Sequence, residues 1–229
     1  MDFIELESPE RRENLLPFQG FHYPVTEIIY LPPPSKNEAV DFFKIVRSRS
    51  TRREFGQITL QQLSELFWYS AKTSLVIELD EGHKWYHRPS PSGGGRHPID
   101  HIIFRYDGGN WDAFLYDSIA HVIGKLEVDS SGMGYWIEDL FRTLGINATT
   151  VVWNIAQFQR STSVYKNASS LIYRDEGAIQ ATFGLVAEAL NLNFCTIGVS
   201  GEPYISRLFM ARGQLRGIGG FCIGPKIIE

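Results

Sequence analysis

The sequence predicts an α+β fold, because helical and strand-like segments mix along the chain and two strands pair near its middle. From Asp175 to Asn191, apolar residues recur at helical spacing. Residues 148–158, "ATTVVWNIAQF", are β-branched and apolar over a length typical of a buried strand. This mixture favours an α+β architecture over a doubly wound parallel sheet.

The first third of the chain begins irregularly and then shows two helix signals. Residues 1–34 show no regular period, so we expect an irregular N-terminal arm followed by one domain over residues 35–229. Ser35-Lys36-Asn37-Glu38 has the form of a capping box and predicts a helix to about Arg47. A similar box over residues 59–62 opens the amphipathic stretch "LQQLSELFWYSA".

The middle of the chain reads as β-structure. Residues 75–98 are rich in loop-forming residues, and "HIIFRY" (101–106) follows as a strand. After the turn "DGGN", the segments "DAFLYD" (112–117) and "HVIGKLEV" (121–128) are expected to form a pair of strands.

The last third alternates helices and strands. We expect a helix over residues 133–144 that Gly145 ends, then the buried strand and the helix from Asp175. "FCTIGV" (194–199) and "GGFCIGP" (219–225) are predicted to be short central strands.

The composition is ordinary for a globular protein and excludes several function classes. Among 229 residues, 22 are lysine or arginine and 26 are aspartate or glutamate, which gives a net charge of −4. We therefore expect no broad binding to nucleic acid. The longest uncharged run, residues 143–159, carries amide side chains and predicts no membrane span, and the N-terminus lacks the apolar core of a secretory signal. These observations predict a cytoplasmic protein. Cys195 and Cys222 lie among apolar residues and are expected to be buried free thiols.

Four arginines lie close together within residues 47–53. In an extended segment, Arg49, Thr51 and Arg53 would point to one side. In a helical segment, Arg49 would share a face with Arg52 or Arg53 instead. Either geometry gathers guanidinium groups, which bind phosphate oxygens bidentately. The alternative is a solvated basic end of a helix.

A second candidate is the stretch "RPSPSGGGRHP", residues 88–98, with three consecutive glycines between prolines. Its backbone N–H groups are not shielded by side chains, and Arg96 and His97 follow directly, so a flat ligand ring could approach the chain closely. The spacing is that of neither a P-loop nor a dinucleotide-binding loop. A plain surface bend is the alternative. A late Gly224-Pro225-Lys226 adds one more basic residue near glycine.

The histidines do not predict a metal site. His83 and His87 are four residues apart, as are His97 and His101, which is a zinc-binding spacing on a helix. The glycines and prolines between and around these pairs exclude a helix through both, and no cysteine joins them. We expect no bound metal.

Taken in order, these motifs resemble the nitroreductase superfamily of flavoproteins. Within it they are most similar to the SagB-type dehydrogenases, which oxidise thiazoline and oxazoline rings of ribosomal peptides to azoles. "RSTRREF" (49–55) and "LSELFW" (63–68) resemble the early signature of the family, and "PSGGGRHP" (91–98) resembles its middle signature. "YRDEGAIQATFGLVAEALNLNFCTIG" (173–198) resembles the late one. The resemblance covers residues 40–226.

The resemblance implies a central, mainly antiparallel sheet flanked by helices, and a homodimer that holds FMN at its interface. The residues that it implies for FMN binding are Arg49, Ser50, Thr51, Arg53, Ser92, Gly93, Gly94, Gly95, Arg96, His97, Ile197, Gly198 and Lys226. The stretch from Ser92 to His97 would lie along the isoalloxazine, and the backbone near Ile197 and Gly198 would face the ring from the other side. Lys226 would be a second phosphate ligand.

The arginine stretch allows two registers within this resemblance. In the first, Arg49, Thr51 and Arg53 hold the FMN phosphate and the ribityl or pyrimidine edge. In the second, Ser50 and Arg52 take that place. Thr51 stands where the family has serine, and it keeps the hydroxyl group.

The resemblance also implies a catalytic pair, Tyr165 and Lys166. SagB-type dehydrogenases carry a Lys-Tyr pair for proton handling shortly before the "YR" element, and here the order is reversed. In a strand, swapped neighbours would lie on opposite faces. A desolvated lysine could remove the ring Cα proton while hydride passes to the flavin N5. The alternative is that both residues lie on a solvated loop.

Three functions therefore stay open at this point. The first is an FMN-dependent oxidoreductase that oxidises peptide azolines or a related heterocycle. The second keeps FMN but reduces nitro or quinone compounds with NAD(P)H. The third is a flavin-fold scaffold subunit without catalytic activity.

Overall fold

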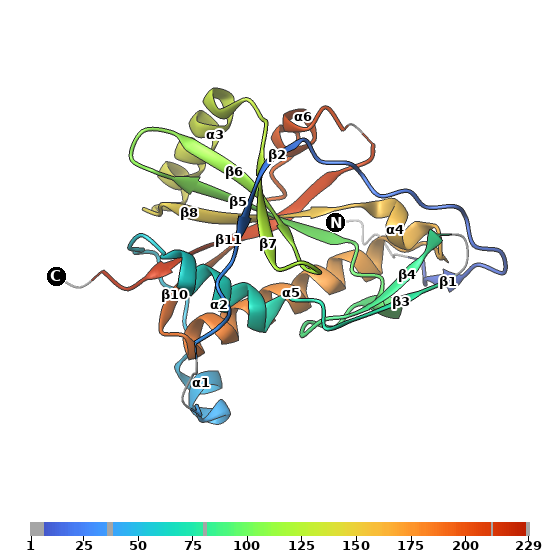
Figure 1. Cartoon of the computed structure of the whole chain (residues 1–229), viewed down its shortest axis with the longest axis horizontal. Coiled ribbons are helices and arrows are strands. Elements are labelled where there is room, and N and C mark those ends of the chain that lie inside the picture. Colours follow the sequence, from blue (N-terminus) through green and yellow to red (C-terminus); the bar gives the residue numbers. More distant parts are fainter. Residues whose placement is uncertain (1–6, 36–38, 80–81, 212, 228–229) are drawn as a thin grey trace, which may run out of the picture.

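A computed structural model of the chain describes residues 7–35, 39–79, 82–211 and 213–227. In this part of the chain, a seven-stranded sheet is enclosed by helices (Figure 1). Its strands lie in the order β10–β11–β8–β5–β6–β7–β2, and every neighbouring pair is antiparallel. The predicted α+β fold with a central antiparallel sheet is thus confirmed.

The elements alternate along the chain as follows. The helices are α1 (Phe42–Ser48), α2 (Leu60–Ser70), α3 (Ser130–Leu144), α4 (Phe158–Thr162), α5 (Ser169–Ala189) and α6 (Tyr204–Leu208), with a 3₁₀ turn η2 (Gly93–Gly95). The strands are β1 (Glu10–Arg11), β2 (Val25–Tyr30), β3 (Leu75–Glu78), β4 (Lys84–His87), β5 (Ile99–Tyr106), β6 (Trp111–Asp117), β7 (Val122–Leu126), β8 (Thr150–Ala156), β9 (Tyr165–Lys166), β10 (Leu192–Ile197) and β11 (Arg216–Pro225).

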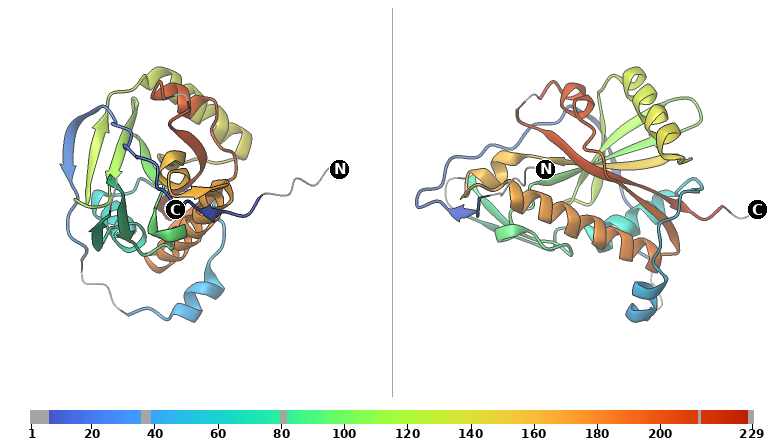
Figure 2. Two further views of the ribbon diagram at one scale, coloured as in Figure 1. Left: turned by 90° about the vertical axis from the view of Figure 1, so that its right-hand side faces the viewer. Right: turned by 180° about the vertical axis from the view of Figure 1, so that it is seen from behind.

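The sheet separates two hydrophobic cores. Helices α2 and α5 cover one face and α3 and α6 cover the other (Figures 1 and 2). Side chains alternate between these faces along β8, so Trp153 packs in the core under α3 and α6 while Val152 packs in the core under α2 and α5. Because both faces of β8 are covered, all seven of its residues are buried.

The two predicted capping boxes have different outcomes. At α2 the box is present: the Thr59 side chain accepts from the backbone of Gln62, and the Gln62 side chain accepts from the backbone of Thr59. Residues 36–38 of the box predicted at Ser35 lie outside the described part of the chain, but the predicted start of the helix at this point is wrong. The backbone N–H and hydroxyl of Ser35 donate to Glu65 on α2 instead. Helix α1 starts later, with Asp41 as its N-cap.

Three predicted boundaries or positions need correction. The arm is not irregular throughout, because β2 within it is an edge strand of the central sheet. Strand β10 was expected to be central and instead lies at the opposite edge. Helix α5 begins at Ser169, six residues before the predicted start, with buried Ser170 and Ile172 in its first turn.

Residues 75–98, expected to be rich in loops, contain the paired strands β3 and β4, and α3 begins at Ser130 rather than at residue 133. The other element predictions are confirmed. Strand β5 includes "HIIFRY", β6 and β7 pair after the turn at Asp107, and α3 ends before Gly145 at φ +62°. Cys195 and Cys222 are buried free thiols directly opposite each other on β10 and β11. Within the described residues, no helix is long and apolar enough to cross a membrane.

Candidate flavin site

Helix α5 sets the distance between the two groups of candidate residues. Near its start, Asp175 accepts hydrogen bonds from Ser92 and Gly93 of the glycine stretch. At its end, Glu188 forms an ion pair with Arg52. The 13 residues that separate the two carboxylates correspond to about 20 Å along a helix. The structure therefore places the glycine stretch and the arginine stretch at opposite ends of α5.

Arg47 lies in the last turn of α1, and the rest of the arginine stretch leaves this helix without regular structure and lies beside β10. The backbone N–H of Arg52 donates to the Phe194 carbonyl at 3.1 Å, and its guanidinium donates to both Glu188 carboxylate oxygens at 2.5 and 3.3 Å. This hydrogen bond lowers the pKa of Glu188. Arg52 is therefore already committed to a partner within its own chain.

The other polar side chains of this stretch are exposed. Arg49, Ser50, Thr51 and Arg53 make no side-chain hydrogen bond or ion pair with any residue that the structure describes. The side chain of Arg53 borders a hollow of about 830 Å³, whose other lining residues are Glu54, Gly145, Ile146, Asn147 and Ile227.

Lys226 is brought to the same end of β10. Strand β11 pairs Pro225 with Leu192, and Gly56 donates its N–H to the Pro225 carbonyl at 2.8 Å. The Lys226 side chain is exposed and lies near enough to Glu188 to lower the pKa of that carboxyl. Lys226, from the last residues of the chain, thus lies close to the arginine stretch.

Ile197 and Gly198 lie at the other end of β10. Four residues separate Phe194 from Gly198, about 13 Å along a strand. The Ile197 side chain is buried in the core under α3 and α6, while Gly198 is exposed. A Cβ at Gly198 would meet no atom within 4 Å. The backbone there has open space beside it.

The glycine stretch is folded onto its own chain. Ser92 donates to Asp175 at 2.6 Å, Gly93 donates through its backbone to the same carboxylate at 2.9 Å, and Ser92 Oγ accepts from the His97 N–H at 2.8 Å. Burial and these hydrogen bonds have opposite effects on the pKa of Asp175. Burial has the larger effect, so the pKa is raised. The carboxylate of Asp175 thus organises the turn.

The three glycines meet side chains of this chain. Gly94 and Gly95 adopt φ +63° and +62°, which disfavours residues with a Cβ. A Cβ at Gly94 would overlap the Tyr165 hydroxyl, and one at Gly95 would overlap the Trp85 indole. The expectation that these faces are bare backbone is therefore wrong for the chain as it stands: they are covered by Tyr165 and Trp85.

Arg96 and His97 are buried rather than presented to a ligand. The Arg96 guanidinium donates to the carbonyls of Lys84 and Arg160 and contacts His83 Nδ1 at 2.8 Å. Burial lowers the pKa of Arg96. Burial, together with the charge of nearby Arg88, lowers the pKa of His97 to about 3, so this ring is neutral. Its Nδ1 is buried with no partner among the described residues.

A buried ionic cluster beside the stretch was not predicted from the sequence. Arg160 donates to the His97 carbonyl at 2.7 Å and to Asp100 at 3.2 Å, while Tyr23 and Gln157 donate to the other Asp100 oxygen. Burial alone would raise the pKa of Asp100, but Arg160 and these hydrogen bonds outweigh it and lower the pKa. No spacing in the sequence connects these four residues.

Tyr165 and Lys166 form the short strand β9, which pairs with β1. The half-buried Tyr165 ring lies on Gly94, and the Lys166 side chain is exposed. The two neighbours thus have different surroundings, as alternation along a strand requires.

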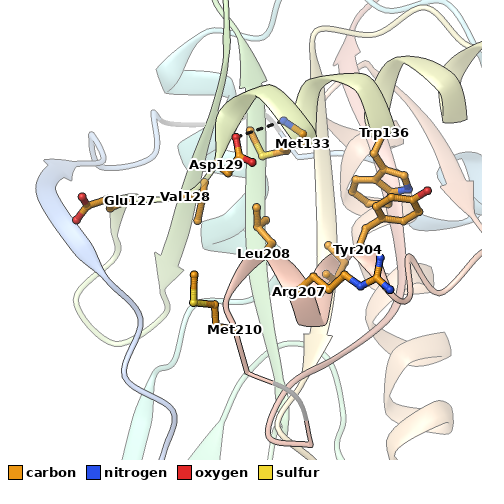
Figure 3. Close-up of a pocket in the computed structure, with 11 residues that line it drawn as sticks. Glu127, Val128, Asp129, Met133, Trp136, Tyr204, Arg207, Leu208 and Met210 are labelled. Atoms are coloured by element: carbon orange, nitrogen blue, oxygen red, sulfur yellow. Dashed lines mark hydrogen bonds between the residues drawn. The ribbon is translucent and has the colours of Figure 1, made fainter.

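A separate hollow of about 480 Å³ lies between α3 and α6, on the sheet face away from α5 (Figure 3). Met133 and Leu208 point into it, and Trp136 stacks with Tyr204 at 5.5 Å between ring centroids. None of the residues predicted to bind FMN lines this hollow.

The residues fit FMN at one end of the site and not at the other. At the end that fits, the side chains of Arg49, Thr51, Arg53 and Lys226 are exposed to receive a phosphate. Gly198 offers open backbone, but at the other end of β10. The glycine stretch instead needs Tyr165 and Trp85 to move before a ring can lie on Gly94 and Gly95.

No model of a protein family and no curated protein matches the sequence. Several solved structures are similar to the fold. One, from Ralstonia eutropha JMP134 and assigned as a nitroreductase, has 20% identity and a TM-score of 0.67 over 97% of this chain and 100% of that chain.

Two further structures extend this comparison. A chain of the Escherichia coli microcin synthetase McbBCD complex, solved with truncated pro-MccB17 bound, has 14% identity and a TM-score of 0.57 over 89% of this chain and 79% of that one. A protein from Desulfovibrio desulfuricans assigned as a nitroreductase, solved in complex with FMN, has 12% identity and a TM-score of 0.50 over 84% and 92%. The protein therefore has the nitroreductase fold.

Proposed function

We propose that this protein is an FMN-dependent oxidoreductase of the SagB type, which oxidises azoline rings in a peptide substrate. The observation that carries the proposal is the group of exposed, uncommitted side chains at Arg49, Thr51, Arg53 and Lys226, which lie together at one end of β10. The open backbone of Gly198 lies at the other end of the same strand. The resemblance of the motifs, the fold and the similarity to a chain of the peptide-bound microcin synthetase complex support it.

The structure favours one register of the arginine stretch for the phosphate. Arg52 is held by Glu188, and moving it would leave a partly buried carboxylate without its partner. Arg49, Thr51 and Arg53 need break no such contact. We therefore assign the phosphate to Arg49, Thr51, Arg53 and Lys226, and we assign to Arg52 the task of fixing the stretch against α5.

When bound, FMN would accept a hydride from the azoline ring carbon. The protein has to hold the flavin, exclude water and remove the ring proton. Lys166 is our candidate base because its side chain carries no ion pair among the described residues. The side chain is exposed in the single chain, so the role requires that the substrate or a second copy covers and desolvates it. The Tyr165 ring would shape the site from the glycine stretch.

We further propose that the flavin lies between two copies of the chain. One protomer places its arginine and glycine stretches at opposite ends of α5, about 20 Å apart. We therefore assign the phosphate to the arginine stretch of one copy and the flavin ring to the glycine stretch of the other. Gly177 and Ala181 expose a small-residue face of α5, and Phe42 and Phe43 of α1 are 61% and 72% exposed. Such faces allow close helix packing and apolar burial.

Loss of either phosphate-binding arginine should release the flavin. We expect Arg49→Ala and Arg53→Ala each to weaken FMN binding at least about tenfold, because a charge-assisted hydrogen bond contributes about 1.5–3 kcal/mol. The measurement is titration of the apoprotein with FMN, followed by the quenching of flavin fluorescence.

Arg142→Ala is the matched control, since Arg142 pairs only with Asp139 and both side chains are more than 70% exposed. It should bind FMN as the unchanged protein does. A purified protein that carries no flavin and binds none at high concentration would support the scaffold function instead. Equal FMN affinity in all three variants would contradict the phosphate assignment.

The azoline reaction should depend on Lys166. We expect Lys166→Ala to lower azole formation at least about a hundredfold, the lower end of what a general base contributes. Flavin content should stay unchanged, because Lys166 is not among the proposed FMN ligands. The measurement is the 2 Da mass loss of an azoline-containing peptide with the FMN-loaded enzyme.

Replacing both Tyr165 and Lys166 by alanine separates the competing functions. A double variant that forms no azole but still reduces nitro or quinone compounds with NAD(P)H would favour the reductase. Azole formation at the unchanged rate in Lys166→Ala would contradict the role of this base.

A further inference from the structure

Residues 8–23, which we call the N-terminal strap, run along one end of the molecule before β2 enters the sheet (Figures 1 and 2). From residue 9 to residue 21, the half-buried positions recur at every third residue: Pro9, Arg12, Leu15, Phe18 and Phe21. A period of three is typical of an extended chain in the polyproline conformation. No side chain of the strap is fully buried before Tyr23.

Backbone hydrogen bonds attach the strap to the segment around Tyr165. Strand β1 pairs Arg11 with Tyr165 and Glu10 with Lys166. The Arg12 N–H donates to the Val164 carbonyl at 2.8 Å, and the Arg12 Nε donates to the Thr162 carbonyl at 2.8 Å. In the part of the chain that the structure describes, β1 is the one strand that pairs with β9.

A second group of contacts holds the middle of the strap. The Leu16 N–H donates to the Ser163 carbonyl at 2.9 Å, and its carbonyl contacts His83 Nε2 at 2.9 Å. The Phe18 ring stacks on His83 and lies 5.8 Å from the Arg160 guanidinium. The partners of the strap include the buried residues His83 and Ser163, but the strap's own side chains are half-buried or exposed before Tyr23. Release of the strap should therefore cost less than global unfolding.

What the strap holds is the cover of the glycine stretch. The Tyr165 ring lies on the face of Gly94 that a flat ligand would need. If the strap leaves, β9 loses its strand partner and Tyr165 can turn away from Gly94. The cover and the strap are therefore mechanically linked through two backbone-paired residues.

We propose that the N-terminal strap is a latch: docked, it holds Tyr165 on Gly94, and released, it frees Gly94 for the flavin. The inference rests on the proposed function, because it takes FMN as the ligand that enters. The docked and released forms exchange, and FMN binds only the released form. The apparent rate of FMN association is therefore proportional to the released fraction. Tyr23, buried and donating to Asp100 at 3.0 Å, marks the point where the moving part ends.

Arg12→Ala tests the latch, with Arg11→Ala as its matched control. Arg12 donates to Thr162 through its side chain, whereas Arg11 is exposed and contacts β9 only through its backbone, so both changes remove one positive charge but only one removes a latch contact. We expect Arg12→Ala to bind FMN about fivefold faster in stopped-flow fluorescence, the factor that one lost hydrogen bond gives. Arg11→Ala should match the unchanged protein.

Amide hydrogen exchange of the flavin-free protein measures how often the strap opens from β9, independently of FMN binding. Amides of β9, residues 165–166, should exchange about fivefold faster in Arg12→Ala and at the unchanged rate in Arg11→Ala. Equal exchange in both variants would overturn the latch. Faster exchange with unchanged or slower FMN association would show that the strap builds the site rather than covers it, which also overturns the proposal. If neither the unchanged protein nor either variant binds FMN, the proposed function fails, and the access of flavin to the glycine stretch fails with it. The exchange rates still decide whether the strap holds β9.

Discussion

Replacing Arg160 by leucine is expected to lower the free energy of unfolding by about 3–5 kcal/mol, the cost of leaving one partner of a buried ion pair alone. The Arg160 and Asp100 side chains are only 13% and 15% exposed. Without the guanidinium, Asp100 keeps Tyr23 and Gln157 as donors but loses its positive partner, and the His97 carbonyl loses a donor at 2.7 Å. Urea unfolding followed by circular dichroism measures the change.

The surface pair of Arg142 and Asp139 provides the control for this experiment. Both side chains are about three-quarters exposed. Arg142→Leu should change the free energy of unfolding by less than about 1 kcal/mol, as exposed pairs do. The double variant Arg160→Leu/Asp100→Leu should recover part of the loss, because it removes the stranded charge. A loss below 1 kcal/mol in Arg160→Leu would mean that water reaches the cluster.

Acidification is expected to destabilise the protein between pH 6.5 and about 4. Burial lowers the pKa of His97 to about 3, and of His101 and His121 to about 4, from an unfolded value near 6.5. Below pH 6.5 the unfolded chain therefore binds more protons than the folded one, so the free energy of unfolding decreases as the pH is lowered. Each histidine adds a slope of about 1.4 kcal/mol per pH unit. Above pH 6.5 these three histidines are neutral in both the folded and the unfolded chain, so they no longer reduce the stability.

Two buried carboxyls act in the opposite direction. Burial raises the pKa of Asp175 and of Glu176, so protonation of these groups favours the folded form and reduces the net slope. Urea unfolding at pH 7, 6 and 5 measures the slope directly. His101→Gln should reduce it by about one proton, whereas His22→Gln, on the exposed strap, should leave it unchanged. A flat profile over this range would contradict the buried neutral histidines.

Local signals in the sequence predicted the elements well. The capping box at Thr59, the turn at Asp107 and the burial of β8 depend on neighbouring residues, and each is present. The helix predicted from Ser35 begins instead after Asp41, and the Ser35 hydroxyl and N–H donate to the distant Glu65. Local chemistry cannot reveal such a distant partner.

The candidate site was predictable in its residue types but not in its arrangement. The glycines at 94 and 95 indicated a close approach to the backbone, yet the partners are Tyr165 and Trp85 of the same chain. Asp175, which holds the turn, is 82 residues from Gly93 along the chain. The cluster around Asp100 joins residues from the strap, β5 and α4. Only the folded chain brings these segments together.

Helix α5 fixes the distance between the glycine stretch and the arginine stretch. Its second turn holds the glycine stretch through Asp175, and its last turn holds Arg52 through Glu188. One residue added or removed between them would rotate the second anchor by about 100° and shift it by about 1.5 Å. A change in the number of residues between Asp175 and Glu188 would therefore displace the arginine stretch relative to the glycine stretch, even if every contact of each stretch were kept.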